Sequence, residues 1–339
     1  MKGAPVNMLF IAGPGRSGTT AFAEYLNRHP QILVCIERYK HIGPQVSPSL
    51  FTFDRILDYR EGETNVSRER HEKLLEKKDP RKLRWIGDKA PGYVRSLQAL
   101  SENNPGARFA VMYRPIEEVA ESYEARSRNP NDRWLGGKNG FEIGIKEWNE
   151  AMRNTRGLIK SGMASKVLLV DYHAFFYDNE ACIPLISWFL DIGFGERIRE
   201  SWSKTSSNFE DKRRHKEPLS DEQQALISQN KDHEIDAWAR KRIQKQWSLL
   251  EADSGEQEEL SVSAARGAHG GHDRLAEDLM RLELESQTLK TRRLEQRVKE
   301  LEQRLAEQEK DRDPGGPDSR DLMRRKLDEL KIRASGKKR

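Results

Sequence analysis

The chain has 339 residues, enough for one large α/β domain with an appendage or for two modest domains. Hydrophobic residues make up only 35% and charged residues 34%, a balance that excludes a wholly globular chain and predicts that part of it is solvated. The net charge is +5, yet residues 320–339 hold nine Lys or Arg against three Asp or Glu, a net of +6, so the remainder is about −1. The basic balance therefore describes a tail and argues against a nucleic-acid-binding core.

Cysteine usage and apolar run lengths narrow the class further. Cys35 and Cys182 each lie in an apolar stretch, where a free thiol behaves as a small hydrophobe, and nothing resembles a disulfide framework or a metal knuckle. Met8–Ile11 is too short for a signal peptide, and no apolar run approaches the ~18 residues that span a bilayer. We therefore expect a soluble, cytoplasmic chain without a metal or a transmembrane segment.

Residues 1–252 alternate short apolar runs with amphipathic helical patterns. Strands are predicted at Met8–Ala12, Ile32–Cys35, Arg84–Ile86, Arg108–Tyr113 and Lys166–Val170. Helices are predicted at Thr19–Arg28, Tyr93–Asn103, Ile116–Arg126, Gly140–Ser161 and Ala181–Leu190, with closing helices over Ser220–Trp247. Strands that alternate with helices predict an α/β domain with a parallel sheet flanked by helices.

The composition then changes. Residues 253–272 are rich in Ser, Gly, Ala and Glu and predict a flexible linker, and residues 313–339 form a basic tail. Between them, residues 273–312 are almost all helix formers, and a 4-3-4 seam predicts a coiled coil: Leu294, Val298, Leu301, Leu305. A second apolar phase competes with it: Leu275, Leu279, Leu282, Leu289. Two interpretations remain, a coiled coil that makes a homo-oligomer and a solvated single helix.

A glycine-rich loop follows the first strand. Residues 9–20 read as strand, glycine loop and helix start, which aims backbone N–H groups at an anion. The glycines allow close backbone approach, and Thr19 and Thr20 add hydroxyl donors. The spacing resembles the phosphate loop G-x-x-x-x-G-K-[ST], but Thr19 stands at the lysine position and Arg16 is the only basic residue in the loop. No strand ends in an obvious magnesium-binding Asp, although Asp171 is a candidate. The loop therefore predicts an anion site other than a nucleoside triphosphate site.

Two motifs together resemble the PAPS-dependent sulfotransferases, where PAPS is 3′-phosphoadenylyl sulfate. Pro14-Gly-Arg-Ser-Gly-Thr-Thr20 resembles their 5′-phosphosulfate loop, and Tyr113-Arg-Pro-Ile-Glu-Glu-Val-Ala-Glu-Ser-Tyr123 resembles their 3′-phosphate unit. The resemblance covers about residues 5–247. It implies PAPS as the sulfuryl donor, no metal, and these cofactor-binding residues: Gly15, Arg16, Ser17, Gly18, Thr19, Thr20, Arg114, Ser122.

Two further segments indicate a branch of the family. Cys35-Ile-Glu37 and Gly87-Asp-Lys-Ala-Pro91 are similar to segments of the tyrosylprotein, heparan-type and bacterial members. The resemblance implies Glu37 as catalytic base, Lys89 as the group that stabilises the bridging oxygen, and Arg16 as a clamp on the phosphosulfate. A carboxylate after an apolar strand is expected to be partly desolvated, with a raised pKa. The Lys-Thr-His segment of the small-molecule sulfotransferases is absent, which favours a carboxylate base over a histidine.

Other candidates stay open. Asp88 is an alternative base, although orienting Lys89 is the preferred role for it, and His41 is a further alternative base. His29, which precedes a proline at a helix end, is expected to cap or pack. The run Lys212-Arg-Arg214 matches loosely a basic loop over the 3′-phosphate, and Ser127–Phe141 is a loop that could line an acceptor cleft.

The resemblance implies transfer of a sulfuryl group from PAPS to an acceptor hydroxyl. The preferred acceptor is a carbohydrate or glycoconjugate, and tyrosine and lipid-linked sugars are further options. Two alternatives come from other classes. One is a small-molecule kinase with a phosphate loop, against which Thr19 speaks. The other is a non-enzymatic domain that serves as the base of a coiled-coil scaffold.

Overall fold

A computed structural model describes residues 6–60, 62–64, 66–131, 139–203, 206 and 219–261, with the side chains of 179, 180 and 251–261 excepted. The predicted coiled coil at 273–312 and the predicted basic tail at 313–339 lie outside these residues, as does most of the predicted linker. The described residues all belong to the unit 1–275.

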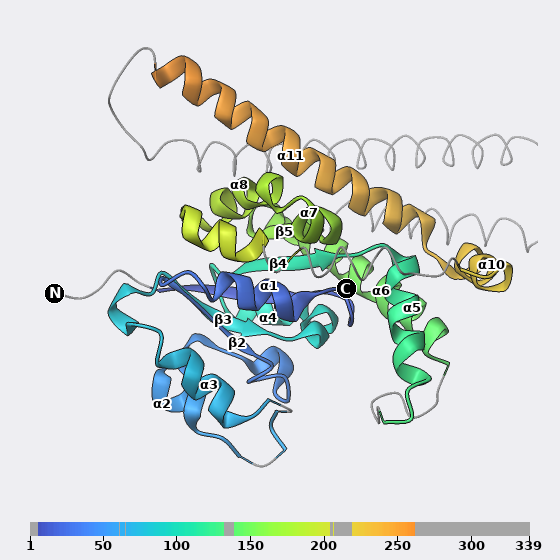
Figure 1. The fold of residues 1–339 in the computed structure, drawn as a ribbon, viewed down its shortest axis with the longest axis horizontal. Coiled ribbons are helices and arrows are strands. Elements are labelled where there is room, and N and C mark those ends of the chain that lie inside the picture. The colour runs from blue at the N-terminus through green and yellow to red at the C-terminus, as the bar shows by residue number, and fades with distance from the viewer. Residues whose placement is uncertain are drawn as a thin grey trace, which may run out of the picture. The chain divides into compact units, whose positions relative to one another are not determined.

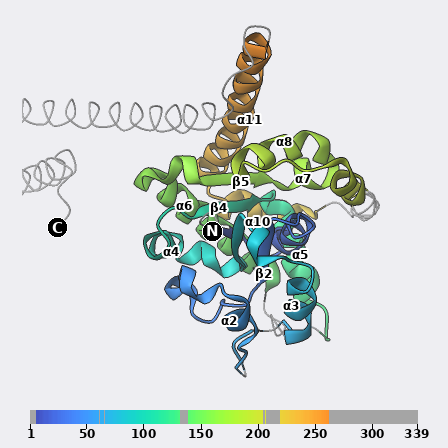
Figure 2. The same ribbon diagram turned by 90° about the vertical axis from the view of Figure 1, so that its left-hand side faces the viewer.

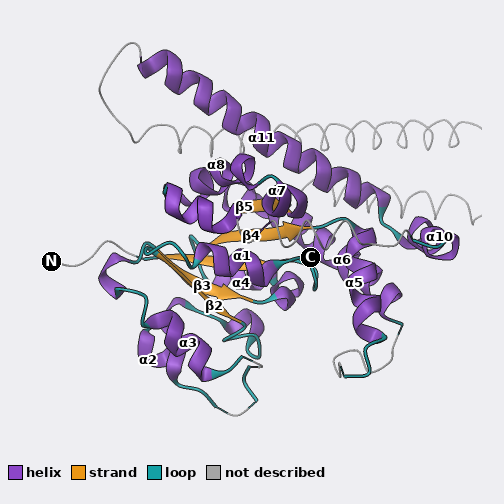
Figure 3. Ribbon diagram, viewed as in Figure 1, coloured by secondary structure: helices purple, strands orange, loops and turns teal. Residues whose placement is uncertain are grey.

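Five parallel strands form one sheet, whose order is β2-β3-β1-β4-β5 (Figure 3). The strands are β1 Asn7–Ala12, β2 Ile32–Ile36, β3 Trp85–Lys89, β4 Arg108–Tyr113 and β5 Val167–Asp171. The apolar runs are almost wholly buried, as expected for parallel strands covered on both faces. The predicted parallel sheet is confirmed, and β4 has the predicted ends.

Strand β3 differs from its prediction at both ends. The sequence predicted Arg84–Ile86, but the strand runs on through Asp88 and Lys89. The polar residues at its end break the apolar run, so the sequence pattern ends before the strand does. Strand β3 is stabilised by pairing with β1 on one side and with β2 on the other. Gly87 is required there, because a Cβ at this position would lie 1.7 Å from the carbonyl oxygen of Leu9.

Helices cover both faces of the sheet (Figures 1 and 2). They are α1 Thr19–Leu26, α2 Phe53–Leu57, α3 Arg68–Leu75, α4 Leu97–Asn103, α5 Ile116–Ser127, α6 Gly140–Leu158, α7 Tyr172–Tyr177, α8 Asn179–Leu190, α10 Asp221–Asn230 and α11 His233–Ser261. Short 3₁₀ turns are η1 Gly43–Gln45, η2 Pro48–Leu50, η3 Pro80–Lys82, η4 Pro91–Arg95 and η6 Ala164–Lys166, and η5 Ile159–Met163 is a π-helical turn. Residues 196–203 are also helical.

The helix predictions are mostly confirmed, with two kinds of difference. Helices α2, α3 and α7 were not predicted, because they are short and α3 is mostly charged. Helix α11 extends to Ser261, into the segment predicted as a linker from residue 253. Its helix-forming residues continue past Trp247 without a glycine or proline until Gly255, which the helix includes.

Two hydrophobic cores lie on opposite faces of the sheet. One face packs against α4, α5, α6 and α11, around Phe10, Phe109 and Trp148. The other packs against α1, α7 and α8, around Phe22 and Phe175, whose rings meet edge to face at 5.0 Å. Both cysteines are free and buried in these cores.

Helix α11 completes the described domain at the β5 edge. The Gln246 side chain accepts a hydrogen bond from the Leu169 N–H (3.0 Å) and donates one to its carbonyl oxygen (2.9 Å). These bonds occupy backbone groups that an edge strand otherwise leaves unpaired.

All five strands point the same way, so their carboxyl ends meet at one edge of the sheet. The glycine loop follows β1, Glu37 follows β2, Lys89 ends β3 and Arg114 follows β4. Residues far apart in the sequence thus lie at the edge where ligands bind in open α/β sheets.

Candidate active site

The glycine loop between β1 and α1 contains three residues with positive φ angles. Gly13 (φ +151°) and Gly18 (φ +84°) adopt conformations that favour glycine, and Arg16 adopts the left-handed region (φ +67°) without being a glycine. At Gly15 a Cβ would lie 2.2 Å from the Tyr123 hydroxyl oxygen on α5. The glycine spacing therefore fixes both the turn and the contact between this loop and α5.

The hydroxyl side chains of the loop differ in what they do. Ser17 is fully buried, and its Oγ donates to the carbonyl oxygen of Pro14 at 2.6 Å, so the side chain braces the loop from inside. Thr19 and Thr20 begin α1, and Thr19 is nearly buried. The first N–H groups of that helix have no partners within it, which leaves them available to an anion.

The structure brings Arg16, Arg114 and Ser122 together. The Arg16 Nε donates to the Ser122 Oγ at 3.1 Å, and the Arg114 Nη1 donates to the Arg16 carbonyl oxygen at 2.7 Å. Arg114 and Ser122 are thus linked through Arg16, which joins the two predicted phosphate sites into one network. The loop arginine thus lies between Arg114 and Ser122, the two residues that the resemblance assigns to the 3′-phosphate.

Three residues that the sequence analysis missed hold Arg114 in place. The Arg114 Nε pairs with Glu118 Oε2 at 3.0 Å, and the guanidinium lies 4.3 Å from the ring centre of Tyr172. His173 Nε2 contacts Glu118 Oε1 at 2.5 Å. Burial raises the pKa of Glu118, but His173 and Arg114 outweigh it and lower that pKa to about 2. Glu118 stands four residues after Arg114 on α5, a spacing that could have indicated the pair.

The second half of the site is an ion pair between the ends of β2 and β3. The Lys89 Nζ lies 2.8 Å from Glu37 Oε1, and the Lys89 side chain is 1% exposed. Glu37 adopts the left-handed region (φ +54°), and its N–H donates to the Lys89 carbonyl oxygen at 2.7 Å. Its other carboxylate oxygen, Oε2, lies 3.5 Å from the Lys40 Nζ.

The charge state of Glu37 differs from the expectation. Burial alone raises the pKa of Glu37, as predicted, but the charge and hydrogen bond of Lys89, with a smaller effect of Lys40, lower it below its ordinary value. The predicted raised pKa was therefore wrong in direction, because Lys89 lies 52 residues away in the sequence and its contact is invisible there. Glu37 is ionised at neutral pH.

Asp88 holds the backbone at the end of β3 and in the segment after β2, and no hydrogen bond joins it to the Lys89 ammonium. It is fully buried and accepts hydrogen bonds from the N–H groups of Arg38 (3.1 Å), Tyr39 (2.9 Å) and Lys89 (2.9 Å), and from the Tyr93 hydroxyl (2.6 Å). Burial raises the pKa of Asp88. Four donors occupy this carboxylate, which makes it a poor candidate for the base. It positions the backbone of Lys89 and of the segment after Glu37.

The histidine candidates have structural partners. His41 pairs with Glu63 at 3.5 Å, and the same carboxylate binds the buried Arg38. His29 is buried, accepts from the Gln31 N–H at 3.2 Å and packs on Phe194, and burial lowers its pKa, so the expected capping and packing role is confirmed.

Of the remaining candidate site residues, one caps a helix and the others lie outside the described residues. The Asp171 carboxylate accepts from the Ala174 N–H at 2.8 Å and caps α7. Lys212, Arg213, Arg214 and residues 132–138 of the predicted acceptor loop lie outside the described residues.

Neither a metal cluster nor a membrane-spanning helix occurs among the described residues. No group of three or more His, Cys, Asp or Glu side chains there is arranged to hold an ion. None of the described helices is both long and apolar enough to cross a bilayer.

Comparisons with known proteins identify the family. A family model described as "Sulfotransferase family" matches residues 8–196. No curated protein matches the sequence. Among solved structures, a sulfotransferase domain from the curacin biosynthetic pathway shares 15% identity, with 67% of this chain and 98% of that chain covered and a TM-score of 0.43. The sulfotransferase domain of the Synechococcus PCC 7002 olefin synthase shares 18% identity (82% and 95% covered, TM-score 0.40). A mouse sulfotransferase complexed with PAP shares 16% (60% and 66%, TM-score 0.35).

Proposed function

Because the chain belongs to the sulfotransferase family, we propose that it transfers a sulfuryl group from PAPS to an acceptor hydroxyl of a carbohydrate or glycoconjugate. One observation carries the proposal. The anion-binding loop with Arg16, Arg114 and Ser122 lies at the same sheet edge as the Lys89–Glu37 pair. The N–H of Ala90, next to Lys89, donates to the Ile11 carbonyl oxygen at 3.1 Å, which ties the two halves to neighbouring strands.

The described residues fit a donor with two anionic ends. Helix α1 and the glycine loop present N–H groups for the phosphosulfate, and Arg16 lies beside them on the exposed surface of the loop. Arg114 and Ser122 offer a guanidinium and a hydroxyl for the 3′-phosphate. When bound, PAPS supplies an activated sulfuryl group, and no metal is needed to neutralise the charge if these cations do so.

Within this proposal, Glu37 is the general base. Its Oε1 is held by Lys89, so Oε2 is the oxygen that takes the proton of the acceptor hydroxyl. The lowered pKa keeps the carboxylate ionised and ready to accept. The Lys89 ammonium carries three N–H donors and uses one on Glu37, and another stabilises the negative charge on the leaving oxygen.

The kinase alternative loses support from the same geometry. Asp171, the magnesium candidate, uses its carboxylate as the cap of α7. Thr19 stands where a triphosphate-binding loop carries its lysine. A non-enzymatic scaffold would have no need of a buried lysine paired with a carboxylate at the same edge as an anion loop, since such a pair is costly to bury.

The test uses binding and turnover separately. Calorimetry should show that 3′-phosphoadenosine 5′-phosphate (PAP) binds and that ATP, which lacks a 3′-phosphate, binds much more weakly. A radiolabelled sulfate-transfer assay on a panel of glycans and phenols should then show transfer to sugar hydroxyls. Equal affinity for ATP would contradict the donor, and transfer to phenols alone would contradict the acceptor class.

We also infer that residues 273–312 associate between chains. Support comes from the 4-3-4 seam in the sequence, whose residues lie beyond the described part of the chain. The competing apolar phase makes a solvated helix the alternative, and the measurement that separates the two is given in the Discussion.

A further inference from the structure

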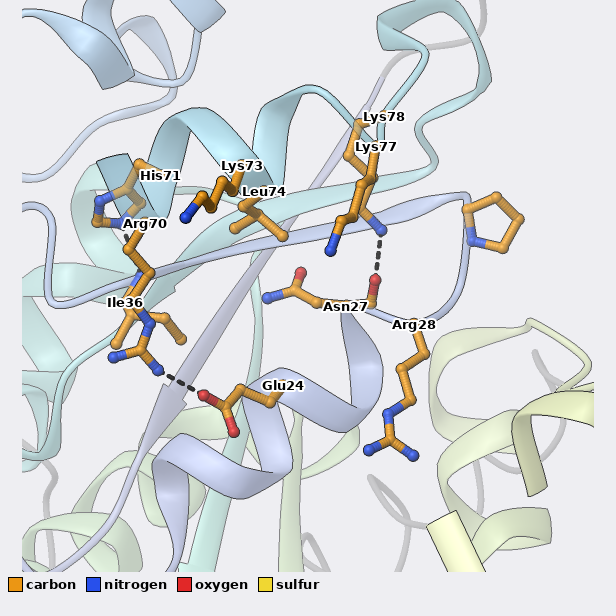
Figure 4. Close-up of a pocket in the computed structure, with 11 residues that line it drawn as sticks. Glu24, Asn27, Arg28, Ile36, Arg70, His71, Lys73, Leu74, Lys77 and Lys78 are labelled. Atoms are coloured by element: carbon orange, nitrogen blue, oxygen red, sulfur yellow. Dashed lines mark hydrogen bonds and ion pairs between the residues drawn. The ribbon is translucent and has the colours of Figure 1, made fainter. Parts of the chain in front are cut away.

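A basic groove lies between α1 and α3, beside β2 (Figure 4). Its volume is about 450 Å³. Glu24 supplies the single carboxylate among the residues that line it. Five lining side chains are cationic: Arg28, Arg70, Lys73, Lys77, Lys78. His71 also lines it, but burial and the nearby arginines lower the pKa of this imidazole to about 4, so it is neutral at pH 7. The lining residues therefore carry a formal charge of +4 at that pH.

The local sequence places the cations in a row. Arg70, Lys73 and Lys77 are spaced i, i+3 and i+7, which puts them on one side of α3 and of the turn that follows it. At 1.5 Å per residue, the first and last lie about 10 Å apart along the axis. One phosphate or sulfate ion is too small to reach both ends of such a row, so a matching ligand carries at least two separated anionic groups.

Internal partners neutralise only part of this charge. Arg70 pairs with Glu24 across the groove, and Lys73 pairs with Glu69 at 2.5 Å on the exposed surface. Lys77 has no acidic partner among the described residues.

Lys78 serves the fold rather than the charge balance. Its Nζ donates to the carbonyl oxygen of Asn27 at 2.7 Å (Figure 4) and to that of His29 at 2.8 Å, which satisfies carbonyl groups just after the end of α1. Because Lys78 is needed there, the positions that can be tested without loss of a helix cap are Lys73 and Lys77.

One end of the groove adjoins the proposed transfer site. Ile36 lines the groove and immediately precedes Glu37, and the Ile36 N–H donates to His71 Nε2 at 3.1 Å. A chain lying along α3 could therefore continue towards the carboxylate that takes the acceptor proton.

We propose that this α1–α3 groove binds the acidic part of a polysaccharide acceptor, through sulfate or carboxylate groups about 10 Å apart. The inference rests on the proposed function, because the polysaccharide is taken to be the acceptor. A nucleic acid fits less well, because the groove lining offers no Phe, Tyr or Trp side chain for base stacking and the chain before residue 320 has a net charge of about −1.

The experiment compares two double variants of the full chain. Lys73→Gln with Lys77→Gln removes two groove charges, and Lys146→Gln with Lys241→Gln removes two exposed lysine charges from α6 and α11 as the matched control. Calorimetry with a heparin-derived hexasaccharide should show about two- to thirtyfold weaker binding for the groove variant, the sum expected for two exposed charge pairs. The control should bind like the unmodified chain, and thermal melting should show that both variants fold.

Two further arms separate the possible outcomes. Inorganic sulfate should not compete with the hexasaccharide at equal charge concentration, and a duplex DNA of matched length should bind more weakly. Equal loss of hexasaccharide binding in both variants would overturn the groove assignment, and stronger DNA binding that depends on Lys73 and Lys77 would replace the polysaccharide by a nucleic acid. Effective competition by inorganic sulfate would reduce the groove to a site for single anions.

The failure of this inference can be told apart from the failure of the proposed function. Hexasaccharide binding is measured without turnover, so it is tested even if sulfate transfer is never detected. If the hexasaccharide is sulfated, the groove variant should raise its KM with little change in kcat, since Lys73 and Lys77 act on binding. Sulfation with an unchanged KM would leave the transferase standing and remove the groove.

Discussion

The two halves of the proposed site hold their charges in different ways. On the phosphate side, Arg16 lies exposed on its loop and Arg114 reaches it through a backbone carbonyl. On the transfer side, Lys89 is 1% exposed and its charge is already matched by Glu37 at 2.8 Å. On the phosphate side Arg114 is paired with Glu118, but Arg16 lies exposed where an anionic ligand can reach it, whereas on the transfer side the buried Lys89 is paired with Glu37.

This difference bears on how each half responds to substitution. Removing a cation from the phosphate side should lower the affinity for an anion and leave the fold intact. Removing one partner of a buried pair leaves the other uncompensated, which affects charge state and stability together.

The largest effect is expected for Glu37→Gln. Gln is nearly isosteric and can still accept a hydrogen bond from Lys89, but it cannot take a proton, so turnover should fall by ~10²–10⁴-fold while PAP affinity is kept. Sulfate transfer and calorimetry measure the two quantities. Glu234→Gln, an exposed carboxylate on α11, is the matched control and should leave both unchanged. A fully active Glu37→Gln enzyme would move the base to Asp88 or His41.

The pH dependence of turnover tests the effect of Lys89 on the charge of Glu37. Because Lys89 lowers the pKa of Glu37 below its ordinary value of 4.5, turnover should fall only as the pH drops through that lowered pKa. Lys89→Ala removes the lowering charge, so the acidic limb of kcat should move to higher pH, and kcat itself should also fall through lost stabilisation of the leaving oxygen. An acidic limb that stays in place in Lys89→Ala would show that another group controls it.

Arg114→Ala tests the phosphate side. The loss of one charged hydrogen bond should weaken PAP binding by ~1.5–3 kcal/mol, or roughly 10- to 150-fold. The chain should still fold, with lower thermal stability because Glu118 loses one of its two cationic partners. Arg128→Ala is a suitable control, because Arg128 follows the same helix, is 73% exposed and pairs only with a carboxylate of its own helix, that of Glu124. Unchanged PAP affinity in Arg114→Ala would remove this residue from the phosphate site.

Asp88→Asn tests the support of the transfer side. An amide nitrogen would face one or more of the four donors that now point at the carboxylate, so the free energy of unfolding should fall by about 1–3 kcal/mol. Denaturant titration measures the loss. The folded fraction should keep more turnover than Glu37→Gln does. A stable but inactive Asp88→Asn would instead make Asp88 the base.

Truncation after Ala252 should have the smallest effect on either half. The side chains of α11 that pack on the domain come earlier, including Ala239, Ile243 and Gln246. We expect the truncated chain to keep its turnover, whereas the full chain should self-associate through residues 273–312. Light scattering of both decides the second point, and two monomeric species would leave a solvated helix.

The sequence predicted the phosphate side better than the transfer side, for a physical reason. The glycine loop and Arg114–Ser122 each lie within one strand–loop–helix unit, so a local motif and its resemblance to the family are enough to name them. Glu37 and Lys89 were named as residues, but their contact joins two strands separated by 52 positions, and that contact reversed the expected pKa shift.

The segment between β2 and β3 could not be predicted because polar contacts hold it. Arg38 is 2% exposed, and its guanidinium donates to the carbonyl oxygen of Ile56 at 2.8 Å and pairs with Glu63 at 2.9 Å. A buried arginine gives no apolar periodicity, and the carbonyl groups that satisfy it leave no trace in the amino-acid sequence. Helix α3 is largely charged, so its pattern resembles a solvated stretch.

Arg16 and Glu37 both adopt the left-handed backbone, and the consequence for stability differs between the two positions. A non-glycine residue in this region costs about 1–2 kcal/mol, and both positions carry side chains on which the proposed reaction depends. Glycine would remove that cost together with the side chain. At position 37 glycine would also leave the buried Lys89 without its carboxylate, and that loss exceeds the backbone gain. A laboratory screen that rewards thermal tolerance alone would therefore tend to collect inactive chains with glycine at 16, and engineering of a hardier enzyme has to select for sulfate transfer at every round.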